Sequence, residues 1–156
     1  IYLVEQILVI MTEKSGISVV VEQLVRAAPG EAWDAITRHE QMTQWFFTNI
    51  PDFEPVTGFQ TVFPVQSGER TFTHVWKILE VVPNRLIRYH WSYVEYPGTG
   101  SVTFELTGKE DRTLIRVTNK GLETFPQDIP EFSAESCQEG WKYFLGRLKE
   151  FIEMNG

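Results

Sequence analysis

The stretch GWKYFLGRLKEFIE, residues 140–153, decides the fold of this chain. Its apolar side chains recur every three or four positions, at Trp141, Phe144, Leu145, Leu148, Phe151 and Ile152. This spacing places them on one wide face of an α-helix. The sequence therefore predicts a long amphipathic helix at about 132–153, which must pack against a broad apolar surface.

The segments before this helix supply that surface as β-strands. Six stretches either are rich in β-branched and aromatic residues or alternate between apolar and polar ones. They are residues 17–26, 59–65, 70–82, 85–93, 101–108 and 113–121. Short turn signals at 83–84, 95–100 and 109–112 join the later strands, which indicates antiparallel neighbours.

Two short helices are expected after the first strand, at 28–37 and 39–47, and residues 49–58 are expected to form a loop or short strand. Pro29 suits the first position of the earlier helix. Because strands and helices are segregated along the chain, the fold class is α+β. One helix cannot cover a flat sheet of six or seven strands. We therefore expect the sheet to curve around it and to leave space that aromatic side chains fill or line.

The chain is long enough for one domain, which we place at residues 17–154 because no repeat or linker interrupts it. Residues 1–16 form an N-terminal extension of uncertain origin. Its first ten residues, IYLVEQILVI, are too short to span a membrane and lack the features of a signal peptide. Met11 resembles a natural start. The alternative is a real edge strand, which would have to pack on something such as a neighbouring copy.

Charge and cysteine content narrow the classes of partner. The net charge is −7 and the basic residues are scattered, so nucleic acid and anionic membranes are poor partners. Cys137 is the only cysteine and cannot form an internal disulfide. It lies in the apolar stripe of the last helix, which favours a buried, inert thiol. This cysteine usage suits a cytoplasmic location.

Several segments together resemble a known family. They are APGEAWDAIT followed by QWFF, then ILEVVPNRLIRYHW, SVTFELTG, TLIRVTNKGL and GWKYFLGRLKEFIE, and they span about residues 17–153. In order and spacing they resemble the START-like and birch-pollen-allergen superfamily. Within it, the chain is similar to the domain related to the activator of the 90-kDa heat-shock protein ATPase, a family that includes bacterial stress-response domains.

The resemblance implies a helix-grip fold: a curved antiparallel sheet of six or seven strands wrapped around a long C-terminal helix, with two short helices after the first strand. The chain departs from the family at Asn119, where many relatives carry a histidine before the glycine that ends the last strand. Asparagine keeps a hydrogen-bonding group there but does not titrate.

The sequence offers few groups for chemistry. His90 alternates outward on its strand, and His39 opens the second short helix as a surface or capping residue. His74 shares the inward parity of Phe72 and Trp76, so it is either a satisfied core histidine or a residue that orients a ligand. No metal-ligand spacing, nucleophile elbow or phosphate-binding loop is present. We therefore expect no catalytic residue, metal or cofactor.

The aromatic residues, 13% of the chain, carry the strongest functional signal. They either form a plain core or line a pocket in which a few polar groups orient a ligand. The expected ligand-binding residues are Trp45, Phe46, Phe63, His74, Trp76, Tyr89, Trp91, Phe104, Asn119, Trp141 and Phe144. Among these, Trp45 and Phe46 are expected near the mouth, and His74 and Asn119 are expected to be the polar groups.

The favoured function is therefore the binding of a small apolar or aromatic molecule, such as a lipid, between the sheet and the last helix. The resemblance suggests an alternative, a co-chaperone-like or regulatory interaction domain that binds a chaperone or another protein. An enzyme acting on a hydrophobic substrate ranks third, because no acid–base pair has a recognisable arrangement. Association into a homodimer is compatible with the apolar N-terminus.

Overall fold

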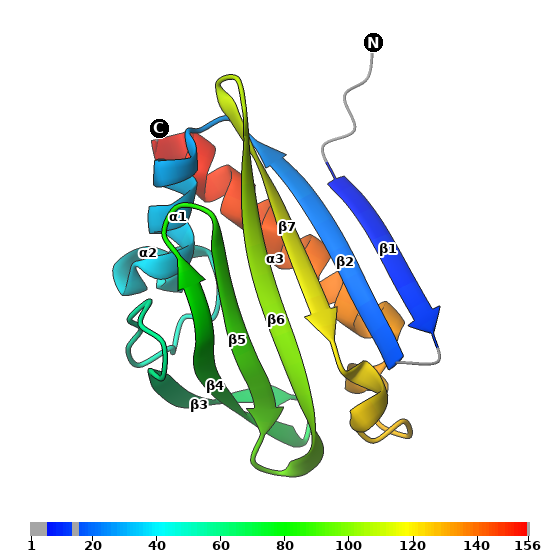
Figure 1. Ribbon diagram of the computed structural model, residues 1–156. Coiled ribbons are helices and arrows are strands. Elements are labelled where there is room, and N and C mark those ends of the chain that lie inside the picture. The colour runs from blue at the N-terminus through cyan, green and yellow to red at the C-terminus, as the bar shows by residue number, and fades with distance from the viewer. Residues whose placement is uncertain (1–5, 14–15, 156) are drawn as a thin grey trace.

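The computed structural model describes residues 6–13 and 16–155, and it places one helix against a curved sheet (Figure 1). The strands are β1 (Gln6–Glu13), β2 (Gly16–Val25), β3 (Gln60–Ser67), β4 (Arg70–Val82), β5 (Leu86–Tyr93), β6 (Tyr96–Lys109) and β7 (Arg112–Lys120). The helices are α1 (Pro29–Thr37), α2 (His39–Trp45) and α3 (Ala134–Asn155), with short 3₁₀ helices η1 (Leu122–Thr124) and η2 (Pro130–Phe132).

All seven strands form one antiparallel sheet in the order β1-β2-β7-β6-β5-β4-β3. In Figure 1, α3 lies behind the sheet, with α1 and α2 beside its C-terminal half and the two 3₁₀ helices beside its start. The predicted α+β class and helix-grip architecture are confirmed. The expected helices and strands occur within a few residues of their predicted limits, apart from the start of β6.

The predicted turn at 95–100 is wrong, because β6 begins at Tyr96 and the turn is made by Val94 and Glu95. The glycine that suggested a turn has another role. Gly98 has φ 126°, and a β-carbon there would overlap the ring of Phe125. Only glycine suits this positive φ and close approach, so the residue lets the strand pass beneath an aromatic ring.

The N-terminal segment had two interpretations, and its described part, Gln6–Glu13, forms the edge strand β1. Gln6 donates from Nε2 to the carbonyl oxygen of Lys142 on α3, at 3.0 Å. Residues 1–5 and 14–15 lie outside the described residues.

The two outer strands of the sheet differ in how they present their edges. On β1, residues 6–12 contain neither a charge nor a proline, and Ile7, Val9, Ile10 and Met11 are all exposed. On β3, Pro64 has no backbone N–H, and its carbonyl oxygen accepts a hydrogen bond from Nδ2 of Asn49 at 2.6 Å. Proline and occupied carbonyls are devices that prevent a further strand from pairing.

The main core lies between α3 and the inward face of the sheet. Alternate residues of the central strands point toward the helix and are fully or almost fully buried: Val19, Val21, Ile87, Tyr89, Val102, Phe104, Ile115 and Val117. The predicted apolar stripe of α3 faces them through Trp141, Leu145, Leu148 and Ile152. The apolar face of α3 therefore packs against the alternating apolar residues of the strands, as the spacing in residues 140–153 predicted.

Replacing Leu145 with alanine should test this contact. Leu145 is fully buried, so the substitution should lower the free energy of unfolding by about 2–5 kcal/mol through lost burial and a cavity. Urea denaturation followed by circular dichroism measures the change. The matched control is Met154→Ala on the same helix, because Met154 is 83% exposed; it should change stability by less than about 0.5 kcal/mol. Equal losses in both variants would contradict the packing described.

Candidate ligand-binding site

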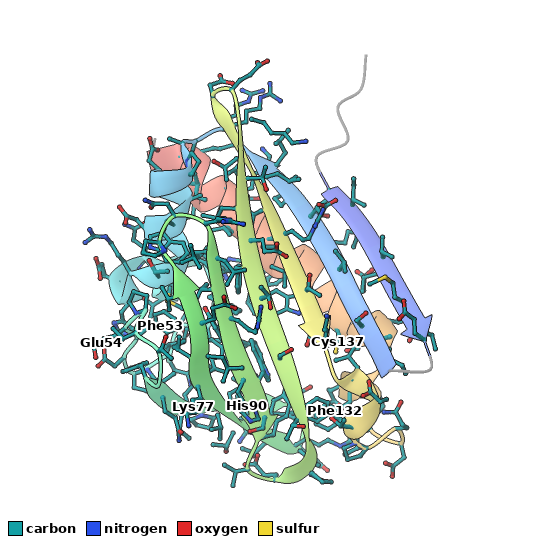
Figure 2. The ribbon with its side chains drawn as sticks, viewed as in Figure 1. Phe53, Glu54, Lys77, His90, Phe132 and Cys137 are labelled. Carbon is teal, nitrogen blue, oxygen red and sulfur yellow. The ribbon has the colours of Figure 1, made fainter. Side chains whose placement is uncertain are left out.

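A cavity of about 350 Å³ opens between the sheet and the first half of α3. Its wall is formed by residues from the loop after α2, from β3, β4, β5, β6 and β7, from the segment carrying the 3₁₀ helices, and from α3. They include Phe46, Phe47, Val65, Phe72, His74, Trp91, Tyr93, Asn119, Leu122, Phe125, Glu131, Phe132, Cys137, Gly140, Trp141 and Phe144. Figure 2 shows Phe132 and Cys137 at the end of the molecule where α3 begins.

The cavity lies at a seam between two groups of packed side chains. The main core forms one group, and Phe72, Phe125 and Phe132 form a smaller separate one. Tyr93 contacts both groups. In the smaller group, the rings of Phe125 and Phe132 stack with centroids 5.1 Å apart. The hollow is thus bounded by rigid rings on both sides, not by loosely packed aliphatic chains.

On the main-core side, Phe46 organises the wall. Its ring lies 5.7 Å from that of Trp141 and 4.9 Å from that of Phe144, and it stacks on Trp45 at 4.6 Å. Trp45 lies behind it, with its Nε1 donating to the carbonyl oxygen of Ala35 at 2.8 Å. That hydrogen bond fastens α2 to α1 and so fixes the position of Phe46, which directly follows α2.

His74 is the polar group most enclosed by rings, and it is 5% exposed. Its Nδ1 lies 2.9 Å from the carbonyl oxygen of Phe72, and its ring stacks on that of Phe63 at 5.1 Å. Burial lowers the pKa of His74 from 6.5 to about 4, although the Phe72 carbonyl and the charge of Glu95 act in the opposite direction. The imidazole is therefore neutral at pH 7.

The pKa values of two further wall residues, Cys137 and Tyr93, are raised by burial. Burial raises the pKa of Cys137 to about 11, so the thiol is protonated and weakly nucleophilic at pH 7. Burial also raises the pKa of Tyr93 far above its ordinary value. The Tyr93 hydroxyl oxygen accepts a hydrogen bond from Nε1 of Trp91 at 2.8 Å. Neither residue has the character of an activated nucleophile or base.

The remaining polar wall residues are Ser67, Asn119, Glu131 and Ser136. The Asn119 side-chain amide makes no hydrogen bond to another described residue, although it lines the cavity. The Glu131 carboxylate accepts hydrogen bonds from Ser67 Oγ at 2.9 Å and from Arg70 at 3.3 Å. Hydrogen bonds from its own backbone and from Ser67 lower the pKa of Glu131, which is therefore ionised at pH 7.

Six of the eleven predicted ligand-binding residues line this cavity: Phe46, His74, Trp91, Asn119, Trp141 and Phe144. The other five do not line it and lie in the main core: Trp45, Phe63, Trp76, Tyr89 and Phe104. The four of them on strands face the core, as their parity predicted, whereas Trp45 was expected near the mouth and is fully buried behind Phe46. Strand parity identifies the face on which a side chain lies, but not whether another side chain covers it.

Sequence reasoning missed several wall residues. Phe72 and Tyr93 share the parity of His74 and Trp91, so the strand pattern contained the signal for them. Phe47 and the phenylalanines of the segment between β7 and α3 had no such signal, because loops have no period. Gly140 lies on α3 at helical spacing from Cys137 and Phe144, so the helix pattern contained the signal for it. Cys137 was predicted to be a buried helix residue, and it is half-buried in the cavity wall.

The other two histidines lie outside the cavity wall. His39 Nε2 lies 2.5 Å from the carbonyl oxygen of Ile50, so it ties a loop to α2 and does not cap the helix. His90 pairs with Lys77 across β4 and β5, away from the core, as Figure 2 shows; the outward prediction for His90 is confirmed.

Within residues 6–13 and 16–155, no group of three or more His, Cys, Asp or Glu side chains is placed to hold a metal ion. None of the helices described combines the length and apolar character needed to cross a membrane.

The burial of neutral His74 should make stability depend on pH. Between about pH 6.5 and pH 4 the unfolded chain binds a proton at His74 that the folded chain excludes, so stability falls as the pH falls. The shift corresponds to a loss of up to about 3 kcal/mol. Urea denaturation of the wild type and of His74→Phe across this pH range measures the loss. The variant should have the shallower pH dependence, and identical dependences would contradict the burial of a neutral ring.

Solved structures of similar architecture support the fold. CalU16 from Micromonospora echinospora is 24% identical, with a TM-score of 0.68 over 96% of this chain and 87% of that one. CV1439 from Chromobacterium violaceum is 19% identical, with a TM-score of 0.74 over 87% of this chain and 96% of that one. DynU16, a protein in the dynemicin biosynthetic locus, is 25% identical, with a TM-score of 0.70 over 88% of this chain and 48% of that one.

No curated protein matches the chain in sequence. A family model does: the one described as Activator of Hsp90 ATPase homolog 1-like protein matches residues 26–153. The match runs from the end of β2 through most of α3 and so includes nearly the whole helix-grip domain. The chain therefore belongs to the family of Activator of Hsp90 ATPase homolog 1-like proteins, as its resemblance predicted.

Proposed function

We propose that this protein binds a small apolar or aromatic molecule in the cavity between the sheet and α3. The observation that carries the proposal is a space of about 350 Å³ walled mainly by aromatic rings, with only a few polar groups. Ligand sites in proteins are concave, mostly apolar and about 300–1,000 Å³ in volume. Each ligand methylene removed from water here would contribute about 0.8 kcal/mol.

The polar atoms of the wall also favour an occupant over plain water. A buried water needs two to four polar partners, and most of this wall is carbon. Nδ1 of His74 is already used, whereas the Asn119 amide is unpaired among the described residues. A ligand that packs against the aromatic rings and forms a hydrogen bond with the Asn119 amide would match both the apolar and the polar parts of the wall.

The comparisons add support of a different kind. DynU16 is described as a protein in the dynemicin biosynthetic locus, and a protein of such a locus works among small organic molecules. An enzymatic role ranks lower, because His74 is bonded to a carbonyl and not to a carboxylate, and the pKa of the Cys137 thiol is raised. We place the protein in the cytoplasm, where an unpaired cysteine stays reduced.

The family's description favours a second candidate, a co-chaperone-like domain that stimulates the ATPase of the 90-kDa heat-shock protein. An assay of that ATPase with and without this protein tests it. Stimulation that survives blocking of the cavity would assign the activity to another surface, and no stimulation would remove this candidate.

Filling the cavity from α3 should abolish ligand binding. Gly140 lines the cavity, and a β-carbon there would meet no other atom within 4 Å. Gly140→Leu should therefore fold normally, because leucine also favours helix over glycine. It should weaken binding of the neutral fluorescent probe N-phenyl-1-naphthylamine by about tenfold or more, equivalent to about 1.4 kcal/mol.

Gly146→Leu is the matched control. Gly146 lies on the same helix with equally open space around its α-carbon, but it does not line this cavity. The control should bind the probe within about twofold of the wild type. A wild type that does not bind the probe, or two variants that bind it equally well, would overturn the proposal.

A further inference from the structure

We infer that the preferred ligand is a neutral aromatic molecule carrying a hydroxyl group, which donates a hydrogen bond to Nε2 of His74 and accepts one from the Tyr93 hydroxyl. The inference rests on the proposed function and names the class of molecule that the same cavity selects.

The hydrogen bond at Nδ1 determines the tautomer of His74. The group facing Nδ1, at 2.9 Å, is the Phe72 carbonyl oxygen, and a carbonyl only accepts hydrogen bonds. Nδ1 must therefore carry the proton. In a neutral imidazole the other nitrogen then has a free lone pair, so Nε2 is an acceptor. Burial keeps the ring neutral and so preserves this state.

The imidazole of His74 lies among aromatic rings. Among the described residues, Nε2 has no hydrogen-bond partner, and the neighbouring groups are rings. Phe47, Phe63, Trp91 and Tyr93 have centroids 4.8–5.4 Å from the imidazole. An acceptor that faces mainly carbon is poorly hydrated and gains little in return. A donor on the ligand would remove this penalty, and a hydrocarbon would not.

A complementary donor, the Tyr93 hydroxyl, belongs to the strand paired with that of His74. His74 and Tyr93 are directly opposite each other on β4 and β5, with side chains on the same face. The Tyr93 oxygen already accepts from Nε1 of Trp91, and its own proton has no acceptor among the described residues. Together the pair offers one acceptor and one donor. A hydroxyl group is both a donor and an acceptor, so it matches the pair.

The charge of the wall excludes anionic alternatives. Among the described residues that line the cavity, the ionised side chain is that of Glu131, an anion already held by Ser67 and Arg70. A carboxylate ligand would meet a neutral imidazole and a negative neighbour. A hydroxyl group brings the same donor without a charge to desolvate.

A matched series of two-ring probes tests the inference: 2-naphthol, 2-methoxynaphthalene, naphthalene and 2-naphthoate. Their affinities can be measured at about pH 7 by quenching of tryptophan fluorescence and by calorimetry. The wild type should bind 2-naphthol about tenfold more tightly than the methyl ether, which accepts but cannot donate. Naphthalene should bind with an affinity similar to the ether's, and 2-naphthoate should bind most weakly.

His74→Phe keeps a ring at the site and should reduce the preference for 2-naphthol to about twofold or less while naphthalene still binds. His90→Phe, the same substitution on the outward face, should keep the full preference. Nitrogen-15 spectra give an independent reading, because only 2-naphthol should shift the Nε2 resonance of His74. The wild-type series needs no variant, so the test stands even if His74→Phe fails to fold.

The outcomes separate the two proposals. Equal affinities for 2-naphthol, its ether and naphthalene would overturn the hydroxyl inference and leave the proposed function standing. Tightest binding of 2-naphthoate would overturn the inference as well. Failure of every neutral probe, including N-phenyl-1-naphthylamine, would overturn the proposed function itself.

Discussion

One helix has to cover the inner face of seven strands, and this mismatch of surfaces determines the rest of the molecule. Helix α3 packs most closely on β2 and reaches β1. The strands at the opposite side of the sheet need another cover, which the end of α2 and its following loop provide through Phe46 and Phe47. The cavity lies where the residues after α2 approach the first half of α3.

The same constraint explains why the few polar groups of the wall have unusual properties. Curvature brings rings from β3, β4 and β5 around His74, so the imidazole loses water without gaining a charged partner. Ionisation then becomes costly, and the ring is held as a directional, uncharged hydrogen-bonding group. Tyr93 and Cys137 are kept protonated for the same reason. At pH 7 these three side chains therefore present uncharged groups to the cavity.

Much of this fold was readable because periodicity and packing agree. The stripe from Trp141 to Ile152 predicted the helix, and the parity of Trp76 and Trp91 predicted the inner face of the sheet. The site was only partly readable. Parity could not separate Trp76, which other side chains cover, from Trp91, which borders the cavity. The difference depends on which side chains outside the sheet pack against each ring.

The errors have physical causes as well. The glycines near Gly98 imitate a turn, but they serve the close approach of a strand to Phe125. Phe125 and Phe132 come from a segment without regular structure, where no repeat relates sequence position to direction. A wall assembled from loops cannot be predicted from the period of the strands beside it.

The unequal borders of the sheet limit how copies of this molecule could ever stack. Pro64 lacks a backbone N–H and its carbonyl is occupied by Asn49 on β3, whereas residues 6–12 of β1 carry neither a charge nor a proline. Continuous growth of a sheet requires two receptive borders on every unit. If two copies paired through β1, the outer strands of the joint sheet would both be β3, which contains Pro64. Pro64 on each remaining outer strand would then disfavour the pairing of a further copy.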